Sequence, residues 1–308
     1  MRADIVCEGG GVKGIALLGA IRYLEEQGYT FERYAGTSVG AIVTSLLAVG
    51  YTGNDMKKLL LELNFKDFYE KNKLNLLPFI GQAVSLFKNK GLFSTNKIEN
   101  YLNSLFEEKG KTKFRDIAIN GVSPLKIIAS DITNKKLLVL PDDLSKYNID
   151  PLDFSIAKAV IMSISIPFYF NPVILKYNNS SSFIVDGGLL SNFPVWLFDV
   201  KDNPRWPTFG LKLISNDDLI TVTQNKSNLI TYSSDLVNTI MSKDDEAILN
   251  NKDSIRTIKI KTYDIKTVDF SISKDEYLKL FNSGYNSART FLAKWDFNSY
   301  VSRYRYNI

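Results

Sequence analysis

The sequence predicts an α/β protein in which helices cover both faces of a mainly parallel central sheet, giving three layers. Two observations predict this class. Short apolar runs alternate with helical patterns through the first fifty residues and again further along the chain. In addition, 45% of the 308 residues are hydrophobic and 23% are charged, which is typical of a globular protein with a substantial core. We therefore expect a single large domain over residues 1–308.

The first fifty residues predict a β-α-β-α unit. Apolar runs indicate strands at residues 5–7 and 31–35. Helical spacing of apolar side chains indicates a helix over residues 12–27 that ends at Gly28, and a second helix over residues 41–49 that stops at Gly50. Because parallel strands need a crossover between them, this order implies a parallel sheet with helices on its faces.

Later segments continue the alternation. We expect strands at residues 125–132, 137–140, 183–185, 209–214 and 255–260, and helices at residues 155–162 and 274–293. A motif-bearing core would then span residues 5–199, with a C-terminal strand and helix over residues 253–294.

Residues 64–94 differ from the rest because a run of apolar side chains is flanked by Lys71, Lys73, Lys88 and Lys90. Such a cap segment suits contact with a lipid–water interface. It suits equally well a helix buried against the sheet.

Composition excludes several classes of active site. The chain has no histidine, which removes a Ser-His-Asp triad and every histidine-containing metal site. The single cysteine, Cys7, excludes an intramolecular disulfide and a thiolate metal cage. Acid–base chemistry must therefore come from Asp, Glu, Lys or Tyr.

The single cysteine favours a reducing, cytoplasmic compartment. The charge is compatible with peripheral contact with an anionic membrane, although a solvated surface explains it more simply, and no nucleic-acid partner is expected. The formal net charge of +5 is mildly basic, and no stretch interleaves basic and aromatic residues in the manner of a nucleic-acid groove. No leader-like segment opens the sequence, and no run approaches the roughly 20 apolar residues that a membrane-spanning helix needs.

A glycine loop follows the first expected strand: Gly9, Gly10, Gly11, Val12, Lys13 and Gly14. It satisfies the G-x-G-x-x-G dinucleotide pattern, and Glu32 lies where a ribose-binding acid is expected. The second strand, however, runs directly into another glycine motif that a dinucleotide site does not require. A P-loop is excluded because no Lys-Ser or Lys-Thr follows the glycines. The loop is then either a tight turn or a nest of N–H groups that binds an oxyanion.

The second motif places Ser38 between Gly36 and Gly40, in the pattern G-x-S-x-G. It lies between an expected strand and an expected helix. That context is typical of a nucleophile held on a sharp turn at the positive end of a helix. A glycine-rich packing turn is the structural alternative.

The third motif is Asp186 followed by Gly187 and Gly188, directly after the strand expected at residues 183–185. A nucleophilic serine needs a base, and without histidine a carboxylate at a strand end is the best candidate. The alternative is an ordinary Asp-Gly turn.

Taken in order, these three motifs resemble the patatin-like phospholipase family, whose pattern is G-G-G-x-[RK]-G, then G-x-S-x-G, then D-G-[GA]. The similarity extends to a Ser-x-x-x-Pro segment at Ser163 and Pro167, and to Asn192, Phe193 and Pro194 after the aspartate motif. Lys13 stands where arginine is common, and Glu8 where many plant members have aspartate.

The resemblance implies a three-layer α/β/α fold and hydrolysis of fatty-acyl esters in membrane lipids. It implies Ser38 as nucleophile, Asp186 as base and no metal or cofactor. It also implies an oxyanion hole formed by Gly9, Gly10, Gly11 and Val12. The closest alternative is a soluble short-chain carboxylesterase or thioesterase. Two others are a lipid-binding protein without catalysis and, from the glycine loop alone, a nucleotide-dependent oxidoreductase.

Overall fold

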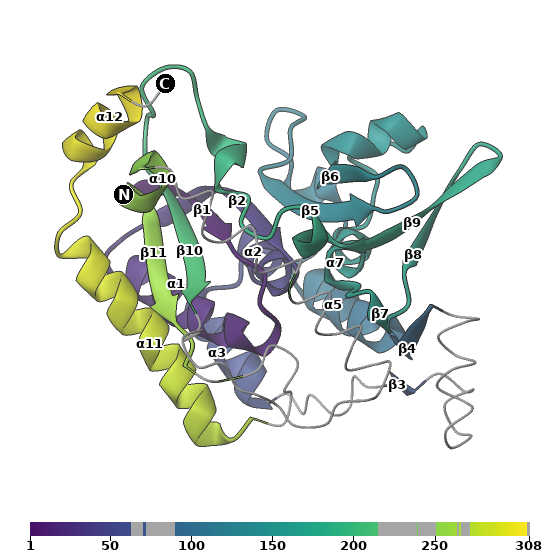
Figure 1. Ribbon diagram of the computed structural model, residues 1–308, viewed down its shortest axis with the longest axis horizontal. Helices are drawn as coiled ribbons and strands as arrows, with labels where there is room; N and C mark the ends of the chain where they lie inside the picture. The colour runs from purple at the N-terminus through teal and green to yellow at the C-terminus, as the bar shows by residue number, and fades with distance from the viewer. Residues whose placement is uncertain are drawn as a thin grey trace. The chain divides into compact units, whose positions relative to one another are not determined.

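The computed structural model describes residues 1–62, 70–71, 90–214, 239, 251–263, 265 and 272–306 (Figure 1). Contacts divide the chain into two units. Unit 1 comprises Met1–Leu63, Phe193–Leu219 and Asp244–Ile308, and unit 2 comprises Asn64–Asn192 and Ile220–Lys243. The cap segment expected at residues 64–94 lies mostly outside the described residues, as do Lys73, Lys88 and the side chain of Lys71.

Unit 1 is an α/β unit built on four parallel strands. The strands are β1 (Arg2–Cys7), β2 (Thr30–Thr37), β10 (Thr208–Ile214) and β11 (Thr257–Lys261). They pair in the order β11-β10-β1-β2, side by side in Figure 1. The helical segments of unit 1 are η1 (Gly11–Gly14), α1 (Ile15–Glu26), α2 (Val39–Val49), α3 (Gly53–Glu62), η6 (Val195–Phe198), α10 (Asn251–Ile255), α11 (Lys274–Leu292) and α12 (Phe297–Tyr306).

Both faces of this sheet are covered, as two neighbouring residues of β10 show. The ring of Phe209 meets the rings of Phe291 in α11 and of Trp295 at centroid distances of 5.9 and 5.1 Å. Gly210 points to the opposite face because side chains alternate along a strand. There, an added Cβ would lie 2.4 Å from the ring of Phe193 and 3.2 Å from Val195 in η6. Coverage on both sides explains why β1 and β10 are almost continuously buried.

Helices α1 and α11 cross at very short range through two glycines. A Cβ on Gly284 of α11 would lie 1.8 Å from the carbonyl oxygen of Ala16, and a Cβ on Gly19 of α1 would lie 1.9 Å from that of Phe281. The obstacle in each case is backbone, which cannot rotate away as a side chain can. The contact therefore requires glycine on both helices.

We expect Gly284→Ala to lower the free energy of unfolding by about 2 kcal/mol or more, since overpacking a tight contact typically costs 1–3 kcal/mol. Urea denaturation followed by circular dichroism measures this. Asn286→Ala, an exposed position two residues along the same helix, is the matched control and should leave the midpoint nearly unchanged. Equal stability of both variants would contradict the close crossing.

Unit 2 contains antiparallel strands. Strands β5 (Leu125–Asp131), β6 (Lys136–Leu140), β8 (Val173–Tyr177) and β9 (Ser180–Asp186) form the pairs β5–β6, β5–β9 and β8–β9. Three short strands, β3 (Glu70–Lys71), β4 (Gly91–Ser94) and β7 (Phe168–Phe170), pair separately. The helical segments are α5 (Asn96–Glu108), α6 (Phe114–Ile117), η4 (Asp142–Tyr147), α7 (Ile156–Ile164) and η5 (Gly187–Leu189).

A buried carboxylate, that of Asp131 at the end of β5, holds the β5–β6 turn of unit 2. It accepts hydrogen bonds from the Tyr147 hydroxyl at 2.6 Å and from the Asn134 side chain at 2.8 Å. Burial by itself would raise the pKa of Asp131, but these hydrogen bonds outweigh it and the pKa is lowered. Asp131 therefore stays ionised in the folded protein and stabilises this turn.

Most expected elements are present at nearly the expected bounds, including α11 and β9. The helix expected over residues 12–27 instead begins with the 3-10 turn η1 before α1. Helices α3, α5 and α12 were not anticipated from the pattern. No helix within the described ranges is both long enough and apolar enough to cross a membrane.

Candidate active site

Ser38 occupies the junction between β2, which ends at Thr37, and α2, which begins at Val39. Its backbone has φ 53° and ψ −126°, a conformation that a residue with a side chain rarely adopts. Such strain costs roughly 1–3 kcal/mol and persists where surrounding structure enforces it. Ser38 is also only 3% exposed. The turn thus has the geometry expected of a nucleophile elbow.

The start of α2 uses the backbone of Ser38 and not its side chain. The Ser38 carbonyl accepts hydrogen bonds from the N–H groups of Ala41 at 2.9 Å and Ile42 at 3.3 Å. The hydroxyl makes no capping hydrogen bond, although serine is a favoured cap residue. Because Ser38 is the residue directly before the first turn of α2, its hydroxyl lies at the positive end of an 11-residue helix, where developing negative charge is stabilised.

The two glycines of the G-x-S-x-G motif are required by close backbone packing. A Cβ on Gly36 would lie 2.3 Å from the carbonyl oxygen of Gly40, and a Cβ on Gly40 would lie 2.2 Å from that of Cys7. The turn therefore folds back on itself and against the end of β1. Both positions therefore require glycine for steric reasons, which the sequence pattern alone only suggests.

The glycine loop lies directly against the nucleophile turn. Gly11 has a positive φ of 54°, and η1 begins at this residue. A Cβ on Gly14 would lie 2.5 Å from the side chain of Val39, the residue after Ser38. The first N–H groups of a helix have no partner inside that helix. The loop expected to hold the oxyanion donors therefore packs against the turn that carries Ser38.

Glu8 has a structural role that the sequence analysis missed. Its side chain is 1% exposed, and Oε2 accepts a hydrogen bond from the backbone N–H of Leu213 in β10. Gly10 also packs closely against Leu213, because a Cβ on Gly10 would lie 2.5 Å from the Leu213 side chain. Glu8 therefore anchors the start of the glycine loop to β10. The sequence feature that could have indicated this role is an acidic residue directly after a buried strand.

Cys7 is adjacent to the Ser38 turn but does not compete with it as a nucleophile. Its side chain is completely buried, and burial raises the pKa of the Cys7 thiol far above its ordinary value. A thiol reacts through its thiolate form, which is not accessible here.

Asp186 is the last residue of β9, in unit 2, and its side chain is completely buried. Its Oδ1 accepts a hydrogen bond from the N–H of Gly188 at 2.7 Å, which fixes the orientation of the carboxylate. Gly187 must be glycine because a Cβ there would lie 2.3 Å from the carbonyl oxygen of Ile128. The D-G-G motif is thus a rigid strand end that presents a buried carboxylate.

The Ser-x-x-x-Pro segment supports this strand end. The N–H of Asp186 donates to the carbonyl oxygen of Ser165 at 2.9 Å. The hydroxyl of Ser163 donates to the carbonyl oxygen of Ile128 in β5 at 2.6 Å, the same carbonyl that Gly187 approaches. The structure therefore brings together the first two motifs in unit 1, and the aspartate motif with the Ser163–Pro167 region in unit 2.

Comparison with known proteins agrees with these motifs. The model of the patatin-like phospholipase family matches residues 5–199, which include all three motifs. The protein YqhO of Bacillus subtilis is 36% identical over 298 residues, covering 96% of this chain and all of the relative. A protein of Invertebrate iridescent virus 6 named "Probable lipid hydrolase 463L" is 30% identical over 194 residues, covering 62% of this chain and 61% of the viral protein.

Solved structures share the α/β fold. VipD from Legionella pneumophila aligns with a TM-score of 0.56 at 18% identity, and ExoU from Pseudomonas aeruginosa aligns with a TM-score of 0.51 at 16% identity. Each alignment covers 94% of this chain, but the chain spans only 66% of VipD and 53% of ExoU. The order of the motifs, the matched residues and the shared fold agree. The chain therefore belongs to the patatin-like phospholipases, a family of lipid acyl hydrolases.

Proposed function

We propose that the protein cleaves fatty-acyl esters of membrane phospholipids through a Ser38–Asp186 dyad, with an oxyanion hole formed by the glycine loop. The observation that carries this proposal is the strained backbone of Ser38, whose φ is 53°, on a turn packed directly against that loop. A strained serine at a strand–helix junction, next to N–H donors at a helix start, is the arrangement that acyl transfer requires.

In the first step, the carboxylate of Asp186 accepts the proton of the Ser38 hydroxyl while Oγ forms a bond to the ester carbonyl carbon. The carbonyl π electrons move to oxygen, and the N–H groups of Gly10, Gly11 and Val12, together with that of Gly9, stabilise the resulting oxyanion. When this intermediate collapses, the carbon–oxygen bond to the lysolipid breaks. The leaving alkoxide takes the proton back from Asp186.

In the second step, water attacks the acyl-serine carbonyl and gives its proton to Asp186. Collapse of the second oxyanion breaks the bond to Ser38, which recovers the proton from Asp186 and releases the fatty acid. The enzyme returns to its starting state with one water consumed. Removing a single oxyanion donor from such a site typically costs about 10²–10³-fold in rate.

Two features of unit 2 support peripheral contact of this enzyme with a membrane. Phe168 in β7 and Ile174 in β8 are large apolar side chains that are 43% and 54% exposed. Lys90, also exposed, places its ammonium group 4.9 Å from the ring of Phe183, which pairs with Ile174 across β8 and β9. Exposed apolar side chains beside a lysine suit an interface with anionic lipid.

A fluorophosphonate probe tests the proposed chemistry, because it reacts only with an activated serine. We expect the probe to label Ser38, as mapped by mass spectrometry of the full chain, and to stop release of fatty acid from phospholipid vesicles in parallel. Release that continues after complete labelling of Ser38 would overturn the proposal.

The same measurement separates the alternatives. A protein that binds lipid without catalysis should bind vesicles but leave Ser38 unlabelled. A soluble short-chain esterase should label at Ser38 and hydrolyse short water-soluble esters, yet release no fatty acid from vesicles.

A further inference from the structure

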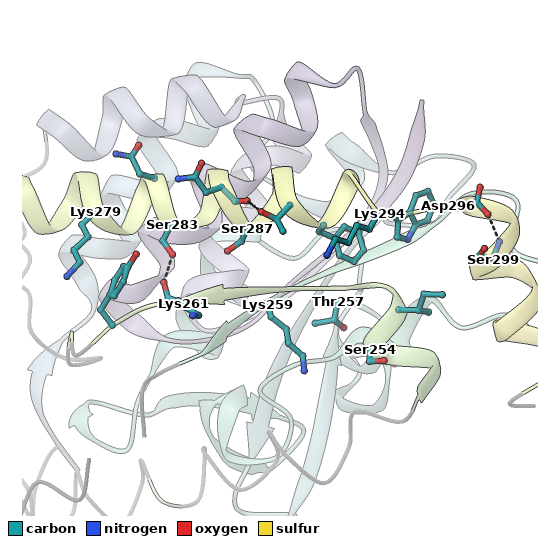
Figure 2. A pocket seen from close by; sticks show the side chains of 17 residues that line it. Ser254, Thr257, Lys259, Lys261, Lys279, Ser283, Ser287, Lys294, Asp296 and Ser299 are labelled. Atoms are coloured by element: carbon teal, nitrogen blue, oxygen red, sulfur yellow. Dashed lines mark hydrogen bonds between the residues drawn. The ribbon is translucent and has the colours of Figure 1, made fainter. Parts of the chain in front are cut away.

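A groove runs along β11 and α11 in unit 1 and extends past the start of α12 (Figure 2). Its volume is about 980 Å³. One wall is the strand β11 with the end of α10, and the other is one side of α11 (Figure 2). The groove is built from residues 254–299, so it contains none of the three sequence motifs.

Four lysines line the groove, two from each wall. On β11, Ile258 and Ile260 pair with Leu211 and Leu213 and share the face of the sheet that α11 covers. Lys259 and Lys261 alternate with them, so both are exposed and start from the opposite face, and Figure 2 shows Lys259 directed away from α11. Lys279 and Lys294 come from α11 and the residues just after it, and Figure 2 shows them at opposite ends of the helical wall. The positive charge is therefore distributed along the groove.

Acids among the described residues do not balance the charge of these lysines. Within that part of the chain the lining contains a single carboxylate, that of Asp296, whose Oδ1 accepts a hydrogen bond from the N–H of Ser299 at 2.7 Å. Over the described ranges, no ion pair involves the ammonium groups of Lys259, Lys261 or Lys294. Other lysines do pair: those at 113, 126, 146 and 158 each contact a carboxylate.

Neutral donors lie between the lysines. The side chains of Asn282, Asn286 and Ser287 face the groove from α11, and each carries an N–H or O–H donor. Lys279 is held in place, since its ammonium group lies 4.1 Å from the centre of the Tyr263 ring. Ammonium groups combined with amide and hydroxyl donors suit the oxygen atoms of a phosphate group.

We propose that this groove is a binding site for a phosphate-bearing anion, separate from the acyl-transfer site. Four ammonium groups that form no ion pair with a carboxylate of the described residues make the electrostatic attraction strong at low ionic strength and weaker as salt screens it. The volume accommodates more than a single phosphate group, so a diphosphate or a phosphorylated head group fits the site. Both sources of phosphate share this chemistry.

Titration of the full chain with inorganic pyrophosphate, followed by calorimetry at low ionic strength, tests the site. We expect the double variant Lys259→Gln/Lys294→Gln to bind about 25-fold more weakly, because each unit charge at contact in water contributes roughly a factor of five. The matched control is Lys97→Gln/Lys136→Gln, which removes the same charge from exposed positions in unit 2 and should bind as tightly as the unchanged chain.

Vesicles of phosphatidylcholine, with or without phosphatidic acid, distinguish the two sources of phosphate. Vesicle binding that depends on phosphatidic acid and on Lys259 and Lys294 identifies a lipid head group, whereas pyrophosphate binding alone identifies a soluble ligand. These measurements use the Ser38→Ala background, so that they do not depend on the proposed hydrolysis. The proposal is overturned if neither probe binds, or if the groove variant and the control variant bind equally well.

Discussion

Replacing Ser38 with alanine is expected to lower the rate of fatty-acid release by at least about three orders of magnitude, because only binding and oxyanion stabilisation remain once a nucleophile is removed. The change removes one oxygen atom. Serine and alanine bear a similar backbone strain at a φ of 53°, so the substitution should change the fold little. Fatty-acid release from phospholipid vesicles measures the activity, and circular dichroism confirms folding.

Ser45 provides the matched control for this substitution. It lies in the same helix α2 and is completely buried, and within the described residues its hydroxyl has no hydrogen-bond partner. Ser45→Ala should therefore leave activity unchanged and stability equal or slightly higher, since an unsatisfied buried hydroxyl is costly. If Ser38→Ala kept full activity, or if Ser45→Ala lost as much, the assignment of the nucleophile would be wrong.

Asp186→Asn is expected to reduce activity by a comparable factor without unfolding the protein. Asparagine has nearly the same shape, and its side-chain oxygen can still accept the hydrogen bond from Gly188 that orients the group. It has no negative charge, however, and cannot take the proton from a serine hydroxyl. Fatty-acid release measured across a range of pH should stay low throughout, because no histidine is present as a substitute base.

Asp131→Asn is the matched control for the base, because Asp131, like Asp186, is a buried aspartate at the end of a strand in unit 2. It should cost about 1.5–3 kcal/mol of stability through weaker hydrogen bonds to Tyr147 and Asn134, but leave the activity of the folded fraction intact. The double variant Ser38→Ala/Asp186→Asn should be no slower than either single variant, since the two residues act as one unit. Additive losses would contradict the dyad.

The nucleophile turn and the aspartate motif could be predicted from sequence because both depend on short-range structure. A strand that ends in Gly36 and Thr37, with an apolar helix beginning one residue later, leaves few backbone conformations for Ser38 between them. The period of the apolar residues likewise predicted β1, β9 and α11 to within a few residues. Helix α5 was missed because most of its side chains are polar and only Leu102, Leu105 and Phe106 are buried, which leaves a weak apolar period.

What the sequence determined by itself is the set of local elements and the residue types at their ends, because sterics and side-chain periodicity act between near neighbours in the chain. Only the tertiary structure decided the rest, because it depends on contacts between distant segments. Glu8 meets Leu213 across 205 residues, Gly19 meets Phe281 between two helices, and the lysines of the groove come from a strand and a helix. A local sequence pattern cannot reveal these long-range contacts, and these contacts set the position of the glycine loop and of the groove.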